Sequence, residues 1–220
     1  MRKRDAVRQT KEVKIDVRTP EGNKVGWQDA THHIGPALRI VPRFTVDAED
    51  DQTGLGNTLD VEYDPVEGRF VIRQASVRSL TGTEITGTEL RQVRLAEALQ
   101  QASPHCVAFT LDDDSNTAVT AADVAAEDQR LLPQWLAATL AELPEGRNLP
   151  EPARTEAREA RLDAVQLVYG VAALTGQPPA KAIERELGVA PRTAAHWIHL
   201  ARQAGRLEGL GYSAGRPPRG

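Results

Sequence analysis

The sequence lacks the features on which secreted, membrane-spanning and aromatic-rich ligand-binding proteins depend. One cysteine in 220 residues, Cys106, excludes an internal disulfide framework and favours a reducing compartment. No apolar run approaches the roughly eighteen residues that a membrane span needs, and none follows the basic N-terminus as in a signal peptide. Aromatic residues make up only 4% of the chain, so nothing indicates a small-molecule pocket. We therefore expect a cytoplasmic protein with no membrane partner.

Clusters of catalytic or metal-ligating residues are also missing. Cys106 follows His105, but no further acid–base partner stands at a recognisable spacing. The adjacent His32 and His33 have no second histidine pair or cysteine at the spacing of a metal site. The acidic run over residues 111–116 lacks the glycine and the distal glutamate of a calcium loop. The sequence therefore predicts no enzymatic activity, no metal site and no cofactor.

Charge is distributed unevenly along the chain. The net charge is −4, yet residues 151–220 carry ten Lys and Arg against seven Asp and Glu, or +3, and the remainder carries −7. A hydrophobic content of 40% is enough for a packed core. A basic end on an acidic body is typical of a protein with one surface that faces nucleic acid.

Alternation of apolar and polar residues predicts strands in the first half of the chain. Residues 13–18 alternate strictly, and residues 59–63 and 69–77 are expected to form a hairpin around a turn at residues 64–68. A further strand over residues 38–46 is interrupted by Pro42, which favours an edge strand or a bulge. The stretch with His32 and His33 is predicted to be a polar surface connection.

Helix signals follow these strands. Thr86 and Glu89 have the spacing of a capping box and predict a helix over about residues 87–101. Alanine-rich residues 119–129 predict a second helix, and another is expected to begin near Pro133. Breakers over residues 143–150 mark a domain boundary.

The C-terminal part is predicted to contain three helices. A long helix over residues 152–174 has an apolar stripe, made of Leu162, Val165, Val168 and Ala172. Pro178 and Pro179 open a second helix, which ends at Gly188, a residue suited to the left-handed conformation of a sharp turn. Pro191 opens a third helix.

These last two helices have the apolar spacing of a helix-turn-helix, in which the second helix lies in the major groove of DNA. The positions at which the helices clamp each other are occupied by Ile183, Leu187, Val189, Ala194 and Trp197. The positions left facing outward, and predicted to contact DNA, are Ala190, Pro191, Arg192, Thr193, Ala195, His196, His199 and Arg202. Arg192 can bond guanine bidentately and Ala195 can contact a thymine methyl group, whereas Arg202 is better placed for phosphate.

At these residues the chain resembles a known family. GVAPRTAAHWIHLARQAGRL and the preceding Pro178-Pro179-Ala180-Lys181-Ala182-Ile183 are similar to the C-terminal part of helix-turn-helix proteins of actinobacteria and their mobile elements. The resemblance covers roughly residues 154–208, and it implies a tri-helical DNA-binding domain. A weaker similarity to the N-terminal half of these proteins spans LDVEYDPVEGRFVIRQASVRS.

The chain departs from the family pattern at three positions. Glu184 replaces a small residue near the helix crossing, Ala190 replaces the serine that caps the recognition helix, and His196 replaces a frequent arginine. Loss of the cap costs about 1 kcal/mol.

The predicted fold class is α+β, with a small β-rich/α N-terminal domain followed by an all-α C-terminal helix-turn-helix domain. We expect a flexible basic segment over residues 1–12, an α+β domain over 13–143, a linker over 144–151, a tri-helical domain over 152–208 and a disordered tail over 209–220. The predicted function is sequence-specific binding of double-stranded DNA as a transcriptional regulator, with a homodimer or a protein partner through residues 13–143. The alternative is an adaptor or assembly protein, phage-derived or cellular, whose C-terminal helices bind protein.

Overall fold

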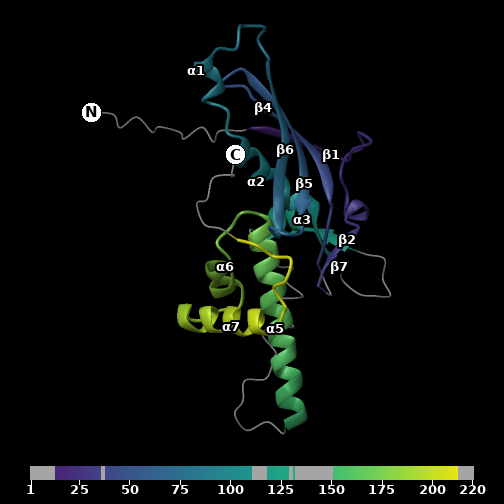
Figure 1. Ribbon diagram of the computed structural model, residues 1–220, viewed down its shortest axis with the longest axis vertical. Coiled ribbons are helices and arrows are strands. Elements are labelled where there is room, and N and C mark those ends of the chain that lie inside the picture. The colour runs from purple at the N-terminus through teal and green to yellow at the C-terminus, as the bar shows by residue number, and fades with distance from the viewer. Residues whose placement is uncertain (1–12, 36–37, 111–117, 129–130, 132–150, 213–220) are drawn as a thin grey trace, which may run out of the picture.

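The computed structural model describes residues 13–35, 38–110, 118–128, 131 and 151–212 (Figure 1). Within these ranges the chain forms two four-stranded antiparallel sheets, with helices concentrated in its C-terminal part. The first sheet has the order β1-β4-β5-β6. Its strands are β1 (Lys14–Arg18), β4 (Arg43–Asp50), β5 (Leu55–Asp64) and β6 (Arg69–Ser79).

Alternation decides which face of the first sheet is buried. Phe44, Val46, Leu59 and Val61 point into the core, and register pairs Phe44 with Val61 and Val46 with Leu59. The outer face carries charged residues that pair across strands. The predicted strand at residues 13–18 and the hairpin of β5 and β6 are therefore confirmed, and the hairpin is longer than the alternation indicated.

The second sheet has the order β2-β3-β7-β8 and consists of short strands. They are β2 (His32–Ile34), β3 (Leu38–Ile40), β7 (Val107–Thr110) and β8 (Ala118–Thr120). His32 and His33 are exposed, as expected, but they lie in β2 and not in a connection.

The single strand predicted over residues 38–46 is wrong, because β3 and β4 belong to different sheets. The chain changes sheets at Val41 and Pro42. The Val41 amide donates to the Cys106 carbonyl (2.9 Å), whereas the Pro42 carbonyl accepts from the Tyr63 amide (2.9 Å). Pro42 has no amide hydrogen to continue the ladder, which explains why the strand ends there.

Between β6 and β7 in the sequence lie α1 (Gly87–Leu90) and α2 (Leu95–Ala102), followed by the 3-10 helix η2 (Ser103–Cys106). A second 3-10 helix, η1 (Trp27–Asp29), precedes β2, and α3 (Ala121–Asp128) follows β8. The capping box of Thr86 and Glu89 is confirmed, but the continuous helix predicted over 87–101 is wrong. The side chain of Leu90 is half exposed, whereas Ala98 and Ala102 of α2 are buried, so burial stabilises α2 more than α1.

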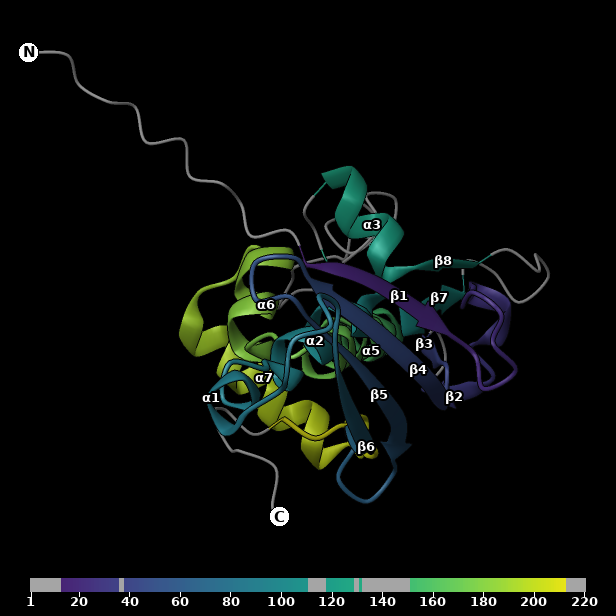
Figure 2. The same ribbon diagram turned by 90° about the horizontal axis from the view of Figure 1, so that it is seen from above.

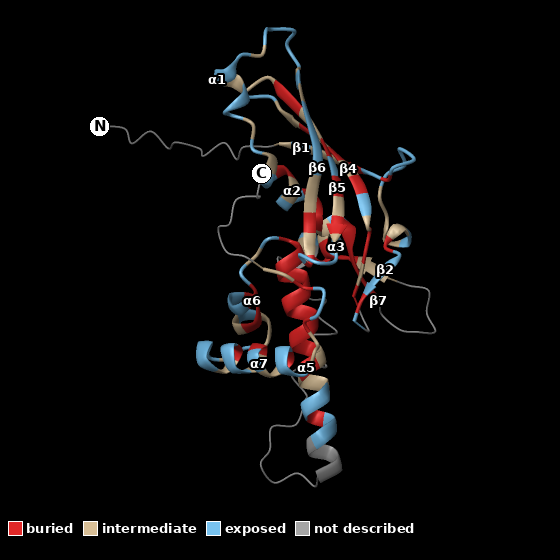
Figure 3. Cartoon of the chain, viewed as in Figure 1, coloured by how far each residue is buried: buried red, intermediate tan, exposed pale blue. Residues whose placement is uncertain are grey.

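The C-terminal part consists of α5 (Glu151–Leu174), α6 (Pro179–Glu186) and α7 (Pro191–Gln203), close to the three predicted helices. The four stripe residues predicted in the long helix are buried, but so are Ala164, Leu167, Tyr169, Val171 and Ala173. Figure 3 shows that α5 is buried along the part nearer its C-terminus, whereas most of residues 155–161 are exposed or half-buried. A helix that is apolar all round is surrounded by other elements.

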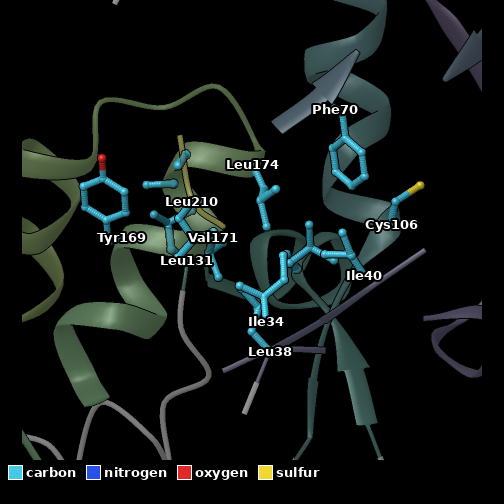
Figure 4. Packing of buried hydrophobic residues seen from close by; sticks show 14 of the residues in the cluster. Ile34, Leu38, Ile40, Phe70, Cys106, Leu131, Tyr169, Val171, Leu174 and Leu210 are labelled. Carbon is cyan, nitrogen blue, oxygen red and sulfur yellow. The ribbon is translucent and has the colours of Figure 1, made fainter. Parts of the chain in front are cut away.

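The predicted fold class is therefore wrong, because in the part of the chain that the structure describes no all-α domain stands apart from a β-rich one. Residues of both sheets, α2, α3, α5, α6 and α7 belong to one hydrophobic cluster. Figure 4 shows Ile34, Leu38 and Ile40 of the second sheet close to Val171 and Leu174 of α5. The fold is a mixed α+β arrangement of two antiparallel sheets at the C-terminal end of α5, with α6 and α7 beside that helix (Figures 1 and 2).

The segment after α7 also packs against the sheets. The Tyr63 hydroxyl of β5 donates to the carbonyl of Gly209, and the Gly211 amide donates to the Gly68 carbonyl (2.9 Å). A Cβ on Gly211 would lie 1.9 Å from the carbonyl oxygen of Glu67, so only glycine allows this approach. The disordered tail was predicted from residue 209, yet residues 209–212 form these contacts. The rest of that tail, residues 213–220, lies outside the described residues. The same holds for residues 1–12, for the predicted linker up to residue 150 and for the predicted helix near Pro133.

Candidate nucleic-acid interface

The unit formed by α6, its turn and α7 is built by local signals in the sequence. Pro179 occupies the first turn of α6 and Pro191 that of α7, where the missing amide hydrogen has no cost. Gly188 adopts a φ of +63°, which ends α6 in the predicted left-handed turn. The Val189 amide donates to the Glu184 carbonyl (3.2 Å) and closes this turn.

The predicted clamp residues hold the two helices together. Ile183 and Ala194 are fully buried at the crossing, and Leu187, Val189 and Trp197 are half-buried against the hydrophobic cluster. The guanidinium of Arg161 in α5 stacks on the Trp197 ring at 5.1 Å from its centroid. This cation–π contact fixes α7 on α5.

A buried carboxylate supports α6 from behind. The side chain of Glu186 is only 1% exposed. Its Oε1 accepts from Arg185 Nε (2.8 Å) and from the Leu131 amide (3.4 Å). Nothing in the sequence pattern indicated this role, because the contact joins residues 55 positions apart. Glu186 therefore does not contribute a charge to the outer surface.

The predicted DNA-contacting residues lie on the outer side of this unit. Ala190, Pro191, Arg192, Ala195, His196, His199 and Arg202 are exposed, and Thr193 is half-buried. The sequence of α7, PRTAAHWIHLARQ, contains no acidic residue. Figure 1 shows α7 extending sideways from α5, away from both sheets. These residues form what we call the α7 face.

The N-terminus of α7 has no side-chain cap. Ala190 occupies the capping position with extended backbone, and its methyl side chain cannot accept a hydrogen bond from the first amides of the helix. The first amide groups of a helix have no partner within the helix, and they attract anions. The α7 face therefore has backbone donors at one end in addition to its side chains.

Two arginines near the C-terminal end of α7 make contacts with residues of α5. Arg202 Nη2 donates to the Tyr169 hydroxyl (3.2 Å), and its guanidinium lies 5.8 Å from the Tyr169 ring centroid. Arg206 pairs with Glu159 (2.5 Å) and Asp163 (3.2 Å) of α5, and the hydrogen bond that Arg206 donates to Glu159 raises the pKa of Arg206. Arg192 makes neither a hydrogen bond nor an ion pair within the described part of the chain, so its charge remains available.

The structure also bears on the other kinds of site considered from the sequence, namely a metal site and a reactive cysteine. Among the described residues, no three His, Cys, Asp or Glu side chains gather closely enough to hold a metal ion. The Cys106 thiol is fully buried, and burial raises its pKa well above the ordinary value. Within the same described ranges, no helix is long and apolar enough to cross a membrane.

We compared the chain with protein families, curated proteins and solved structures. No protein-family model matches the chain, and the comparisons with curated proteins and with solved structures found no match.

Proposed function

We propose that this chain is a sequence-specific DNA-binding protein that regulates transcription and inserts α7 into the major groove. The observation that carries the proposal is the α7 face. Arg192, Ala195, His196 and His199 lie exposed on a helix without acidic residues. That helix is held on α5 by Trp197 and Arg202. The resemblance to helix-turn-helix proteins supports the same assignment, and a regulator of transcription in a bacterium acts in the cytoplasm.

Each residue of the α7 face has a chemical role in this proposal. Arg192 donates bidentately to guanine, and Ala195 contacts a thymine methyl group. His196 and His199 donate to base edges or phosphate. Ala190 and Pro191 begin the helix, and the free backbone amides of Arg192 and Thr193 donate to a phosphate. Arg202, because Tyr169 already holds it, contacts phosphate at the edge of the groove.

The test is selection from genomic fragments with the purified full chain at about physiological salt, followed by sequencing of the retained DNA. A shared short motif among the fragments is expected. Even coverage of the genome would contradict sequence-specific recognition, and no retention would contradict DNA binding altogether.

The competing proposal, an adaptor or assembly protein that uses the same helices, rests on the mild positive charge of this region and on the acidic residues Glu184 and Glu186 of α6. The side chain of Glu186 is buried, whereas Glu184 is half-buried and still supports this alternative. Salt separates the two proposals. Protein–DNA affinity falls steeply between about 50 and 200 mM salt because phosphate contacts release counterions, whereas an apolar helix interface responds little.

A further inference from the structure

One edge of the first sheet is long and uncovered. β6 has 11 residues and ends the strand order β1-β4-β5-β6. Within the described residues, no strand pairs with its outer side, and Gln74, Ala75 and Ser76 are exposed. Figure 3 shows this exposure along the part of β6 farther from α5. An edge strand of this kind offers unpaired backbone donors and acceptors to another strand.

The other edges of the two sheets are poorer templates. β1 has five residues, and its end is followed by a bridge between Arg18 and Lys24 of the same chain. The edges of the second sheet, β2 and β8, have three residues each. Length alone therefore singles out β6 among the described strands.

A bulge limits the part of β6 that is available. The register with β5 passes from Ile72, opposite Val61, to Gln74, opposite Asp60, so Arg73 has no partner residue. A bulge bends the strand and interrupts regular pairing. The regular edge therefore runs from Gln74 to Ser79, a segment of small and polar side chains with one β-branched residue, Val77.

The positive charges of this edge are already compensated. Arg78 pairs with Glu49 (2.9 Å) and Asp47 (3.4 Å), which are the hydrogen bonds that raise its pKa. Arg73 pairs with Glu62 (3.1 Å) and Asp64 (3.3 Å). Both guanidinium groups are therefore directed back onto their own sheet, and a neighbouring β6 meets little repulsion.

We propose that a second copy of this chain pairs with β6 in antiparallel orientation about a two-fold axis at Ser76. Such an axis is perpendicular to the sheet, so the outer face of one copy's sheet continues into the outer face of the other copy's sheet. Within the regular segment Gln74–Ser79, residues that face one another must therefore be two odd or two even positions. Arg78 is the charged residue of this segment, whereas Arg73 lies in the bulge on the same outer face and is paired with Glu62 and Asp64 of its own sheet. With the axis at Ser76, Gln74 opposes Arg78 and Ala75 opposes Val77. Like charges directly opposite one another would destabilise the pairing, and this edge avoids them.

The pairing stands independently of DNA binding, but one consequence rests on the proposed function. A two-fold axis relates the two α7 faces, so the recognised DNA should be an inverted repeat with two half-sites.

The first test is a cysteine scan with the full chain. Ala75→Cys, Ser76→Cys and Val77→Cys each introduce the second cysteine of the chain, and the native Cys106 is fully buried. Opposed residues of antiparallel strands lie close enough for a disulfide. Under mild oxidation, Ser76→Cys should cross-link fastest into covalent dimers, and Gln52→Cys in the exposed β4–β5 turn is the matched control. Cross-linking of the three edge variants no faster than Gln52→Cys would overturn the proposal.

The second test measures self-association without a cross-link. Ser76→Lys places two positive charges across the axis, and sedimentation equilibrium should show dimerisation weakened by up to about fivefold. Gln52→Lys adds the same charge away from the edge and should leave association unchanged. A chain that is monomeric throughout, or a dimer that Ser76→Lys leaves intact, overturns the assignment of β6. Neither test involves DNA, so failure here is distinct from failure of the proposed function.

Discussion

Gly170 of α5 lies against Leu38 of β3 so closely that a Cβ atom on Gly170 would stand 2.8 Å from Leu38 Cδ2. The same Cβ would lie 3.2 Å from Leu210 Cδ1, in the segment after α7. Three parts of the chain that are remote in sequence therefore meet at one glycine of α5. The close approach explains why a helix tolerates glycine here despite its conformational cost.

Gly170→Ala should destabilise the protein even though alanine is the better helix former. The gain in helix propensity is about 1 kcal/mol, whereas overpacking of a tight core costs about 1–3 kcal/mol. We expect a net loss of up to about 2 kcal/mol in the free energy of unfolding, measured by urea denaturation. Gly87→Ala is the control, because a Cβ there meets nothing within 4 Å. Equal stability changes in the two variants would contradict the packing argument.

Arg192→Ala should reduce affinity for the selected DNA motif by about 1–3 kcal/mol and relax the preference for one base pair. Binding is measured by fluorescence anisotropy on the motif and on single-base variants of it. Arg91→Ala removes an equally exposed arginine of the first half of the chain and should have no effect. If the two variants bind alike, Arg192 does not read DNA.

Arg202→Ala should act mainly through the position of α7. The substitution removes the hydrogen bond to Tyr169 and the stacking on its ring, which at a partly exposed site stabilise by about 0.5–1 kcal/mol. Tyr169→Phe keeps the ring and removes only the hydroxyl acceptor. We expect the melting temperature to fall more for Arg202→Ala than for Tyr169→Phe. A loss of DNA affinity with unchanged melting would instead show that Arg202 serves as a phosphate contact alone.

Cys106 should make stability depend on alkaline pH. Burial raises the pKa of its thiol in the folded protein, so the folded state keeps the proton while the unfolded chain loses it above about pH 8.5. The unfolded state then binds fewer protons, and the free energy of unfolding falls by up to about 1.4 kcal/mol per pH unit as pH rises. Below that pH the contribution is fully present.

Denaturation curves of the native chain and of Cys106→Ala between about pH 7 and 10 test this dependence, because only the native chain has the thiol. The difference between the two should shrink as pH rises. Parallel curves would show that the thiol is not protected in the folded state.

The short-range features of the fold could be predicted because neighbouring residues specify them. The two prolines and Gly188 mark the ends of α6 and α7, and alternation locates β5 and β6. The capping box starts α1, but the length of the helix depends on tertiary packing, and the side chain of Leu90 is half exposed. In the α7 face, exposure of the predicted residues follows from helical periodicity. The contact of Arg202 with Tyr169 could not be predicted, since it depends on how α7 crosses α5.

The sequence by itself determined the ends of α6 and α7, the position of β1 and of the hairpin of β5 and β6, and that the α7 face bears no acidic residue. These properties depend on the backbone preferences and side-chain periodicity of adjacent residues. Only the tertiary structure decided that residues 38–46 divide between two sheets and that Glu186 is buried. It also decided that α5 joins both sheets to α6 and α7 in one core. Those outcomes depend on contacts between distant residues, and the periodicity of one segment specifies which face is buried but not which element covers it.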